Sequence, residues 1–263
     1  MICIGAIIGD TIGSVYEFSN IKSKNFDLEN ANSRMTDDSF MTLAVIEYFS
    51  CNCQKPIESY LRKWGLEHPF AGYGLKFNEW IMNHSMGPYF SYGNGAAMRI
   101  SPVGWFCSNE KEVKIMSHKI TACSHNHPEA IKAAEVVSMC IYYAKIGKTK
   151  KFIENYIKRK YEINFDYKSL VKNYIFDETC QGSVPQALYC FLISNSFEDC
   201  LRTAVSIGGD SDTIAAIACS VAEAYYKKIP IFLMHIIESK LTDNEKCLLL
   251  TFESKCKEHN KKC

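Results

Sequence analysis

The sequence has few of the features that would assign it to a specialised class of protein. No run approaches the roughly 20 apolar residues of a membrane-spanning helix, so we expect no membrane segment. The net charge is only +1, which gives no general attraction to nucleic acids or anionic membranes. The apolar start, residues 1–9, has no basic region and leads directly into Asp10, which argues against a secretory signal. These absences favour a soluble, unprocessed protein.

Cysteines are numerous, but they lack the spacing of a metal site or a disulfide framework. The chain has 13 cysteines and no C-x-x-C pair, and only Cys51 and Cys53 lie close together. This pattern argues against a zinc site and against a set of disulfides. Cys140, Cys190 and Cys219 fall on apolar helical faces, where a thiol behaves as a small hydrophobic group. We therefore predict a reducing intracellular compartment, the cytoplasm, and no cysteine has a context that singles it out as a nucleophile.

Strand-like alternation is scarce, whereas apolar residues often recur at helical spacing. Hydrophobic residues make up 47% and charged residues 22% of the 263-residue chain, an ordinary globular composition without repeats or low-complexity linkers. We predict an all-α fold, a compact orthogonal helical bundle that forms a single domain over residues 1–263. Helices are expected at 38–51, 56–67, 71–83, 128–145, 183–194 and 197–207, with a central apolar helix after Asp210. Residues 19–35 and 84–104 are expected to be loops, and residues 148–180 short surface helices.

A hydroxyl and two carboxylates, those of Thr36, Asp37 and Asp38, stand directly before an amphipathic helical run. Thr36 or Asp37 is expected to be the N-cap of that helix, with Asp38 in its first turn. Capping explains one acid at a helix start, because the helix dipole favours negative charge there. Two adjacent acids repel each other unless a cation lies between them.

The same arrangement returns at Gly208-Gly-Asp-Ser-Asp-Thr213, where Asp210 or Ser211 is expected to cap the most apolar helix of the chain. Two such clusters in one sequence exceed what capping alone requires. Ionised oxygen ligands are those that a hard cation such as Mg²⁺ or Mn²⁺ prefers. Taken together, the clusters favour a metal site over two independent helix caps.

Glycines at positions 5, 9 and 13 line one side of a predicted N-terminal helix and would allow another backbone to approach closely. Glu17 continues this row at i+4, so its carboxylate is expected to project from the glycine face. The alternative for Glu17 is a solvated helix end.

The stretch 84–104 is rich in glycine and aromatic residues. Gly93, Asn94 and Gly95 can adopt positive φ and present free N–H groups to an anion, although a purely structural loop has the same composition. His125 and His127 lie just before the helix that begins near Pro128, which is also a position that favours anions. A lone histidine there is otherwise an ordinary turn residue.

Five motifs, taken in order, resemble those of the ADP-ribosylglycohydrolase family. They are Gly9-Asp-Thr-Ile-Gly through Glu17, Thr36-Asp-Asp, Tyr92-Gly-Asn-Gly-Ala-Ala-Met-Arg, Ser124-His-Asn-His-Pro-Glu-Ala and Gly208-Gly-Asp-Ser-Asp-Thr. The resemblance covers residues 5 to about 230, and residues 148–180 match nothing in it. It implies a compact all-α domain with a cleft that holds two Mg²⁺ or Mn²⁺ ions.

The resemblance also implies roles for individual residues. The metal ligands would be Thr36, Asp37, Asp38, Asp210, Asp212 and Thr213. Glu17 would be a further ligand or a gate, and Glu17, Asp37, Asp38 and Asp212 are the residues that we expect to serve catalysis. ADP-ribose would be bound by Ser91, Tyr92, Gly93, Asn94, Gly95 and His125.

Three functions remain open at this point. The first is a metal-dependent hydrolase that releases ADP-ribose from a modified protein side chain such as Arg or Ser. The second is a metallohydrolase that acts on a free ADP-ribosyl metabolite or nucleotide sugar. The third is a non-catalytic, crystallin-like relative, which we would expect to lack some of the acids that are present here. Partners are accordingly ADP-ribose or an ADP-ribosylated protein, with no membrane, and nucleic acid only as a possible ADP-ribosylated substrate.

Overall fold

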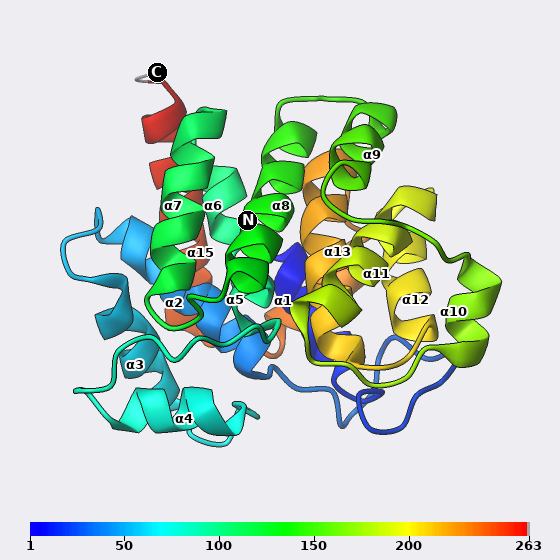
Figure 1. The fold of residues 1–263 in the computed structure, drawn as a ribbon, viewed down its shortest axis with the longest axis horizontal. Coiled ribbons are helices and arrows are strands. Elements are labelled where there is room, and N and C mark those ends of the chain that lie inside the picture. Colours follow the sequence, from blue (N-terminus) through cyan, green and yellow to red (C-terminus); the bar gives the residue numbers. More distant parts are fainter. Residues whose placement is uncertain (262–263) are drawn as a thin grey trace.

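The computed structural model describes residues 1–261, so residues 262–263 of the predicted domain lie outside the described part of the chain. Residues 1–261 form fifteen helices and no β-strand, which confirms the predicted all-α fold (Figure 1). The helices are α1 (Gly5–Gly13), α2 (Asp37–Ser50), α3 (Ile57–Glu67), α4 (Leu75–Met82), α5 (Gly95–Met98), α6 (Ser101–Phe106), α7 (Glu110–Ala122), α8 (Pro128–Lys145), α9 (Lys150–Lys158), α10 (Tyr167–Asn173), α11 (Cys180–Ile193), α12 (Phe197–Ser206), α13 (Ser211–Tyr226), α14 (Ile231–Glu238) and α15 (Asp243–Lys261).

Helix α13 occupies the centre of the bundle, as the sequence predicts. It packs against α1, α8, α11 and α12, and Figure 1 shows it between α8 and α12. Every residue from Ser211 to Ala224 is buried, so the helix has no solvent-facing side over almost four turns. Such a helix has a fixed position, and its N-terminal acids are therefore fixed as well.

The glycine row of α1 brings this helix very close to α13. A Cβ atom at Gly5 would lie 2.6 Å from the carbonyl oxygen of Cys219, and one at Gly9 would lie 2.3 Å from that of Ala215. At Gly13 it would lie 2.6 Å from the Cα of Asp212. Glycine therefore lets the backbones of α1 and α13 touch directly. Helix α1 ends at Gly13, so the prediction that Glu17 continues the helical row is wrong; Glu17 lies in the bend just after the turn 14–16.

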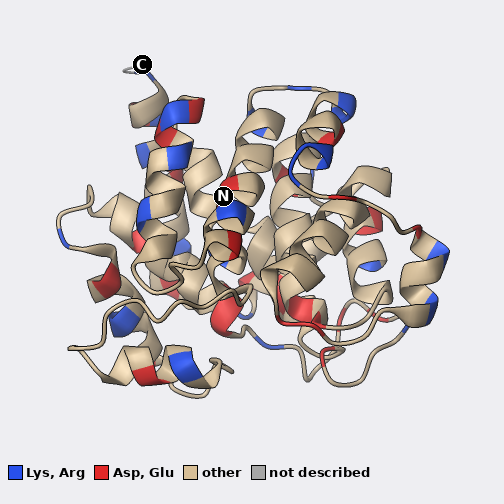
Figure 2. Cartoon of the chain, in the orientation of Figure 1, with Lys and Arg blue, Asp and Glu red and all other residues tan. Residues whose placement is uncertain are grey.

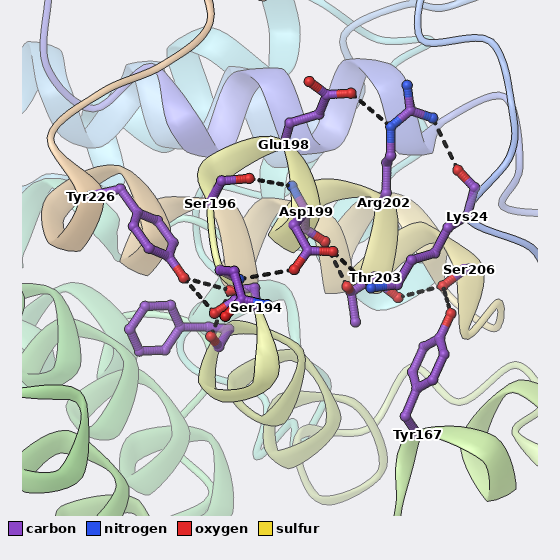
Figure 3. Close-up of polar contacts among 12 residues, drawn as sticks. Lys24, Tyr167, Ser194, Ser196, Glu198, Asp199, Arg202, Thr203, Ser206 and Tyr226 are labelled. Atoms are coloured by element: carbon purple, nitrogen blue, oxygen red, sulfur yellow. Dashed lines mark hydrogen bonds and ion pairs between the residues drawn. The ribbon is translucent and has the colours of Figure 1, made fainter.

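The polar loop that joins α1 to α2 is tied to α12. Lys24 Nζ lies 2.8 Å from Asp199 Oδ1, and Arg202 donates a hydrogen bond of 3.0 Å to the carbonyl oxygen of Lys24 (Figure 3). Arg202 also donates a bond of 2.9 Å to the carbonyl oxygen of Phe26. The Ser196 hydroxyl caps α12 by accepting a bond of 3.0 Å from Asp199 N. These contacts hold the loop that carries the chain from Glu17 to the start of α2.

Local chemistry explains where helix bounds differ from the prediction. Helix α4 begins at Leu75 rather than at residue 71, because Gly72 has φ +110° and interrupts the helical backbone. Helix α11 begins at Cys180 because the Thr179 side chain caps it by accepting a 3.0 Å bond from Gly182 N. The expected loop 84–104 contains the short helix α5 and the first residues of α6.

Charged residues are mixed over the helices, and the view in Figure 2 shows no face dominated by one sign. Within residues 1–261 no helix is both long and apolar enough to cross a membrane.

Candidate active site and metal centre

Three helix ends converge on one side of the bundle and bring the two acid clusters together. Asp10 lies near the end of α1, Asp38 in the first turn of α2, and Asp212 in the first turn of α13. Asp38 and Asp212 line a cavity of about 590 Å³, and the carboxylate of Asp10 lies next to theirs. Its lining includes the predicted residues Glu17, Thr36, Asp37, Asp38, Ser91, Gly93, Asn94, Gly95, His125, Asp210, Asp212 and Thr213. The fold thus gathers positions that lie up to about 200 residues apart in the chain.

Asp10 belongs to this site, although sequence reasoning gave it no role of its own. Its carboxylate accepts hydrogen bonds from Thr36 N at 2.9 Å, Thr36 Oγ1 at 2.7 Å and Ser39 N at 3.1 Å, and also from the Ser39 hydroxyl. Thr36 takes the N-cap position of α2, but its hydroxyl is directed to Asp10 instead of capping its own helix. An aspartate from α1 therefore caps α2. The available signal was a lone acid inside an otherwise apolar helix.

Two overlapping triads of acids have the spacing of metal ligands. Oxygen atoms of Asp10, Asp38 and Asp212 lie within 4.8 Å of one another, and so do those of Glu17, Asp210 and Asp212. Asp212 belongs to both triads. The Oδ1 atom of Asp38 is buried and accepts no hydrogen bond from the described residues. A buried carboxylate oxygen without a partner is costly, so the donor set fits a hard divalent cation that would take this oxygen as a ligand.

Burial and mutual repulsion raise the pKa values of these acids. Burial raises the pKa of Asp10 to about 6, while burial and the charge of Asp210 raise that of Glu17 to about 7. Burial, with the charges of Asp10 and Asp210, raises the pKa of Asp37 to about 8. Burial and the neighbouring carboxylates hold the pKa values of Asp38 and Asp212 well above the usual range. The arrangement is unfavourable by itself, and bound cations would restore the ionised forms.

Hydroxyl and amide groups fix the orientation of the acids. Thr213 Oγ1 donates a bond of 3.1 Å to Asp38 Oδ2, which links α13 to α2. Asn94 Nδ2 donates a bond of 2.7 Å to Asp210 Oδ2. Asp210 takes the N-cap position of α13 without a side-chain capping bond, so its carboxylate serves the site instead of the helix. The Ser211 hydroxyl is also turned away from its helix, to the carbonyl oxygen of Gly13 at 3.0 Å.

The glycine-rich stretch forms a wall of the cavity, but its backbone differs from the expectation. The N–H of Asn94 donates to the carbonyl oxygen of Glu178 at 2.8 Å, and that of Gly93 donates to Ser91 Oγ at 3.1 Å. None of Gly93, Asn94 and Gly95 has positive φ. The expected free N–H groups at positions 93 and 94 are therefore occupied within the wall.

Tyr92 is the one predicted ligand-binding residue that does not line the cavity. Its side chain is half exposed, and its ring contacts that of His127 edge to face with 5.4 Å between the centroids. Tyr92 and His127 thus lie outside the cavity lining, whereas His125 is within it.

The mouth of the cavity carries apolar side chains that the sequence did not identify. Phe18 follows Glu17, and its ring stacks on that of Phe176 at a centroid distance of 6.1 Å. Leu75, at the start of α4, is almost fully exposed. We call these three residues the apolar rim. Phe176 comes from the segment 148–180, for which the sequence predicted no role in the site, so this segment contributes to the entrance.

Comparisons with known proteins place the chain in a family. The mouse ADP-ribosylhydrolase ARH3 is 23% identical over 302 residues, covering 84% of this chain and 82% of the mouse protein. The ADP-ribosyl-[dinitrogen reductase] glycohydrolase of Rhodospirillum rubrum is 26% identical over 140 residues, covering 51% of this chain and 46% of its own length. A solved ADP-ribosylglycohydrolase-related protein complex shares the fold, with a TM-score of 0.72 and 21% identity over 97% of this chain and 96% of that one. The family model for ADP-ribosylglycohydrolase matches residues 2–246, and the protein therefore belongs to the ADP-ribosylglycohydrolase family.

Proposed function

We propose that the protein hydrolyses the glycosidic bond between ADP-ribose and an acceptor group, such as a modified Arg or Ser side chain, and releases ADP-ribose. The observation that carries this proposal is the pair of acid triads that share Asp212, all buried except for the half-buried Glu17, beside a cavity large enough for a nucleotide. We also propose that the protein acts in the cytoplasm, on the grounds of its free, scattered cysteines.

In this proposal one set of residues holds metal ions and another binds the ADP-ribose. Two Mg²⁺ or Mn²⁺ ions, when bound, would orient ribose hydroxyls and lower the pKa of a water molecule. The residues that would hold them are Thr36, Asp37, Asp38, Asp210, Asp212 and Thr213, and we propose Asp10 as a further ligand because its carboxylate lies with those of Asp38 and Asp212. Ser91, Gly93, Asn94, Gly95 and His125 would bind the ADP-ribose, and Tyr92 would do so only if its side chain turned inward.

Cleavage at the anomeric carbon builds positive charge on the ribose, which nearby carboxylates stabilise. One of Asp37, Asp38 and Asp212 would accept the proton of the attacking water. Glu17 lies in a bend beside Asp210 and Asp212, where it would act as a further ligand or a gate.

Substrate turnover tests the proposal directly. Arginine-linked, serine-linked and DNA-linked ADP-ribose would each be incubated with the protein and Mg²⁺ or Mn²⁺, with Asp212→Asn as the matched inactive control. Release of free ADP-ribose from one substrate by the parent but not by the variant supports the proposal and identifies the linkage.

The same assay addresses the alternatives. Turnover of a free ADP-ribosyl metabolite alone would favour the metabolite hydrolase. The apolar rim favours a protein acceptor over a free metabolite, because it extends the entrance beyond the acids and provides an apolar surface for a larger acceptor. No turnover, and no rise in melting temperature with millimolar ADP-ribose and metal present, would overturn the proposed function.

A further inference from the structure

Arg99 is a fully buried arginine at the edge of the cavity. Its guanidinium donates to the carbonyl oxygens of Gly95 at 3.1 Å and Ile120 at 3.3 Å, and to Ser124 Oγ at 2.8 Å. Its face lies over the ring of Phe77 at 5.3 Å. Among residues 1–261 its hydrogen-bond partners are thus two carbonyl oxygens and one hydroxyl, and none is a carboxylate. Arg99 therefore has no hydrogen-bonded acid within residues 1–261, and the charge of Asp37 acts on it only from a greater distance.

The contact between Arg99 and Ser124 determines the direction in which the Ser124 hydroxyl donates its hydrogen bond. A guanidinium only donates hydrogen bonds, so Ser124 Oγ must be the acceptor in its bond with Arg99. The nitrogen Nδ1 of His125 lies 2.8 Å from Ser124 Oγ, while the next contact of this oxygen, with Cys123 Sγ, is at 4.0 Å. If His125 Nδ1 carried a proton, the serine hydroxyl would have no oxygen or nitrogen to donate to in a buried site. Such an unsatisfied donor is costly, so Ser124 donates to an unprotonated Nδ1.

The environment of His125 also keeps its ring neutral. The side chain is buried, and burial together with the charge of Arg99 lowers the pKa of His125 well below its usual value. The groups that face the ring are Arg99, the Ser124 hydroxyl, the Tyr89 phenol and the ring of Phe77, and none of them is an acid. A neutral ring with a free Nδ1 must carry its proton on Nε2.

The Nε2 atom faces the glycine-rich wall. It lies 3.4 Å from the Tyr89 hydroxyl and 3.3 Å from the place that a Cβ atom of Gly95 would occupy. Any larger residue at position 95 would crowd this nitrogen, so the glycine keeps space beside it. The contact of 3.4 Å with the Tyr89 hydroxyl is long for a hydrogen bond, so the N–H group can still donate to an oxygen atom of a bound molecule in this space.

We propose that Arg99, acting through Ser124, is a positioning residue that holds His125 as the neutral Nε2–H tautomer and so fixes one hydrogen-bond donor in the cavity wall. The donor suits a phosphate or ribose oxygen, and this assignment of the ligand rests on the proposed function. The tautomer itself does not depend on it. His125 is accordingly a binding group and not a proton donor in the reaction.

Nitrogen-15 spectra of the histidine rings test the tautomer without any ligand. His125 would be assigned by the loss of its signals in His125→Gln. We expect an unprotonated Nδ1 and a protonated Nε2 between pH 6 and 8 in the parent protein. An Nδ1–H tautomer or a doubly protonated ring in that range would overturn the proposal.

Ser124→Ala then tests the relay, with Ser138→Ala as the matched control. Ser138 is also a buried serine, but its hydroxyl donates only to carbonyl oxygens within α8. We expect Ser124→Ala to mix the two His125 tautomers and to weaken ADP-ribose binding about fivefold, the value of one ordinary hydrogen bond. Ser138→Ala should change neither. An unchanged His125 spectrum in Ser124→Ala would contradict the role of Ser124 in fixing the tautomer. If the parent protein shows the predicted tautomer but does not bind ADP-ribose, only the proposed function is contradicted.

Discussion

Replacement of Gly9 by alanine is the most direct test of how α1 positions the acids. The added methyl group would lie 2.3 Å from the carbonyl oxygen and 2.4 Å from the carbonyl carbon of Ala215. Both are backbone atoms of a fully buried helix, so they cannot rotate away as a side chain would. Overpacking of this kind lowers the free energy of unfolding by about 1–3 kcal/mol. We expect a value near the upper limit because the atoms in the way belong to the backbone. The higher helix propensity of alanine offsets about 1 kcal/mol of this loss.

The net expectation for Gly9→Ala is a loss of about 2 kcal/mol in the free energy of unfolding. This corresponds to a fall of roughly 4–8 °C in melting temperature for a protein of this size. Urea unfolding and thermal melting would measure it, with Gly87→Ala as the control because no heavy atom lies within 4 Å of a Cβ atom there. A parent-like stability of Gly9→Ala would refute the reasoning. So would rescue by Ala215→Gly, which removes a methyl group but leaves the obstructing backbone in place.

Three further predictions follow from the acids. Asp38→Asn and Asp212→Asn should weaken Mg²⁺ binding in calorimetry while folding is retained, since Asp10 caps α2; undiminished binding in both variants would exclude the metal centre. Glu17→Gln should reduce turnover by orders of magnitude while ADP-ribose still binds, and a variant with the parent rate would remove Glu17 from the mechanism. Burial raises the pKa of Glu223 to about 7, so the folded protein favours the protonated form of this side chain. The free energy of unfolding of the parent therefore falls as the pH rises through about 7. Glutamine does not titrate, so the difference in free energy of unfolding between Glu223→Gln and the parent should grow in favour of the variant from pH 5 to pH 8, by about 3 kcal/mol at most. The same difference at both pH values would contradict this.

The acids at the starts of α2 and α13 could be predicted because a helix start has a local sequence signal. Asp38 and Asp212 were identified in this way, and the structure brings them into one triad. Asp10 was not, because its role depends on a neighbouring helix whose position no local pattern gives. Glu17 lies beside Asp210 and Asp212, although α1 ends four residues before it. The sequence thus pointed to a residue of the acid cluster, but the helical spacing from which Glu17 was predicted is not present in the structure.

The glycine-rich wall was the least predictable part of the site. Its composition indicated a loop, but the short helix α5 and the first residues of α6 form there, and the N–H of Asn94 pairs with Glu178, some 84 residues away. A pairing over that distance is tertiary and leaves no trace in local sequence. The outward position of Tyr92 follows from the same pairing, because Cys180 N donates to its carbonyl oxygen and fixes the local backbone.

The apolar rim has a consequence for how this protein could diverge from its relatives. Phe18 and Phe176 belong to connecting segments, whereas Asp10, Asp38 and Asp212 belong to helices that touch one another backbone to backbone or through shared hydrogen bonds. Substitution at the entrance therefore leaves the acids undisturbed, while substitution among the acids disturbs the packing as well. We expect mutational drift to change the preferred acceptor before it changes the chemistry, and an entrance library randomised at positions 18 and 176 to yield folded proteins with altered selectivity.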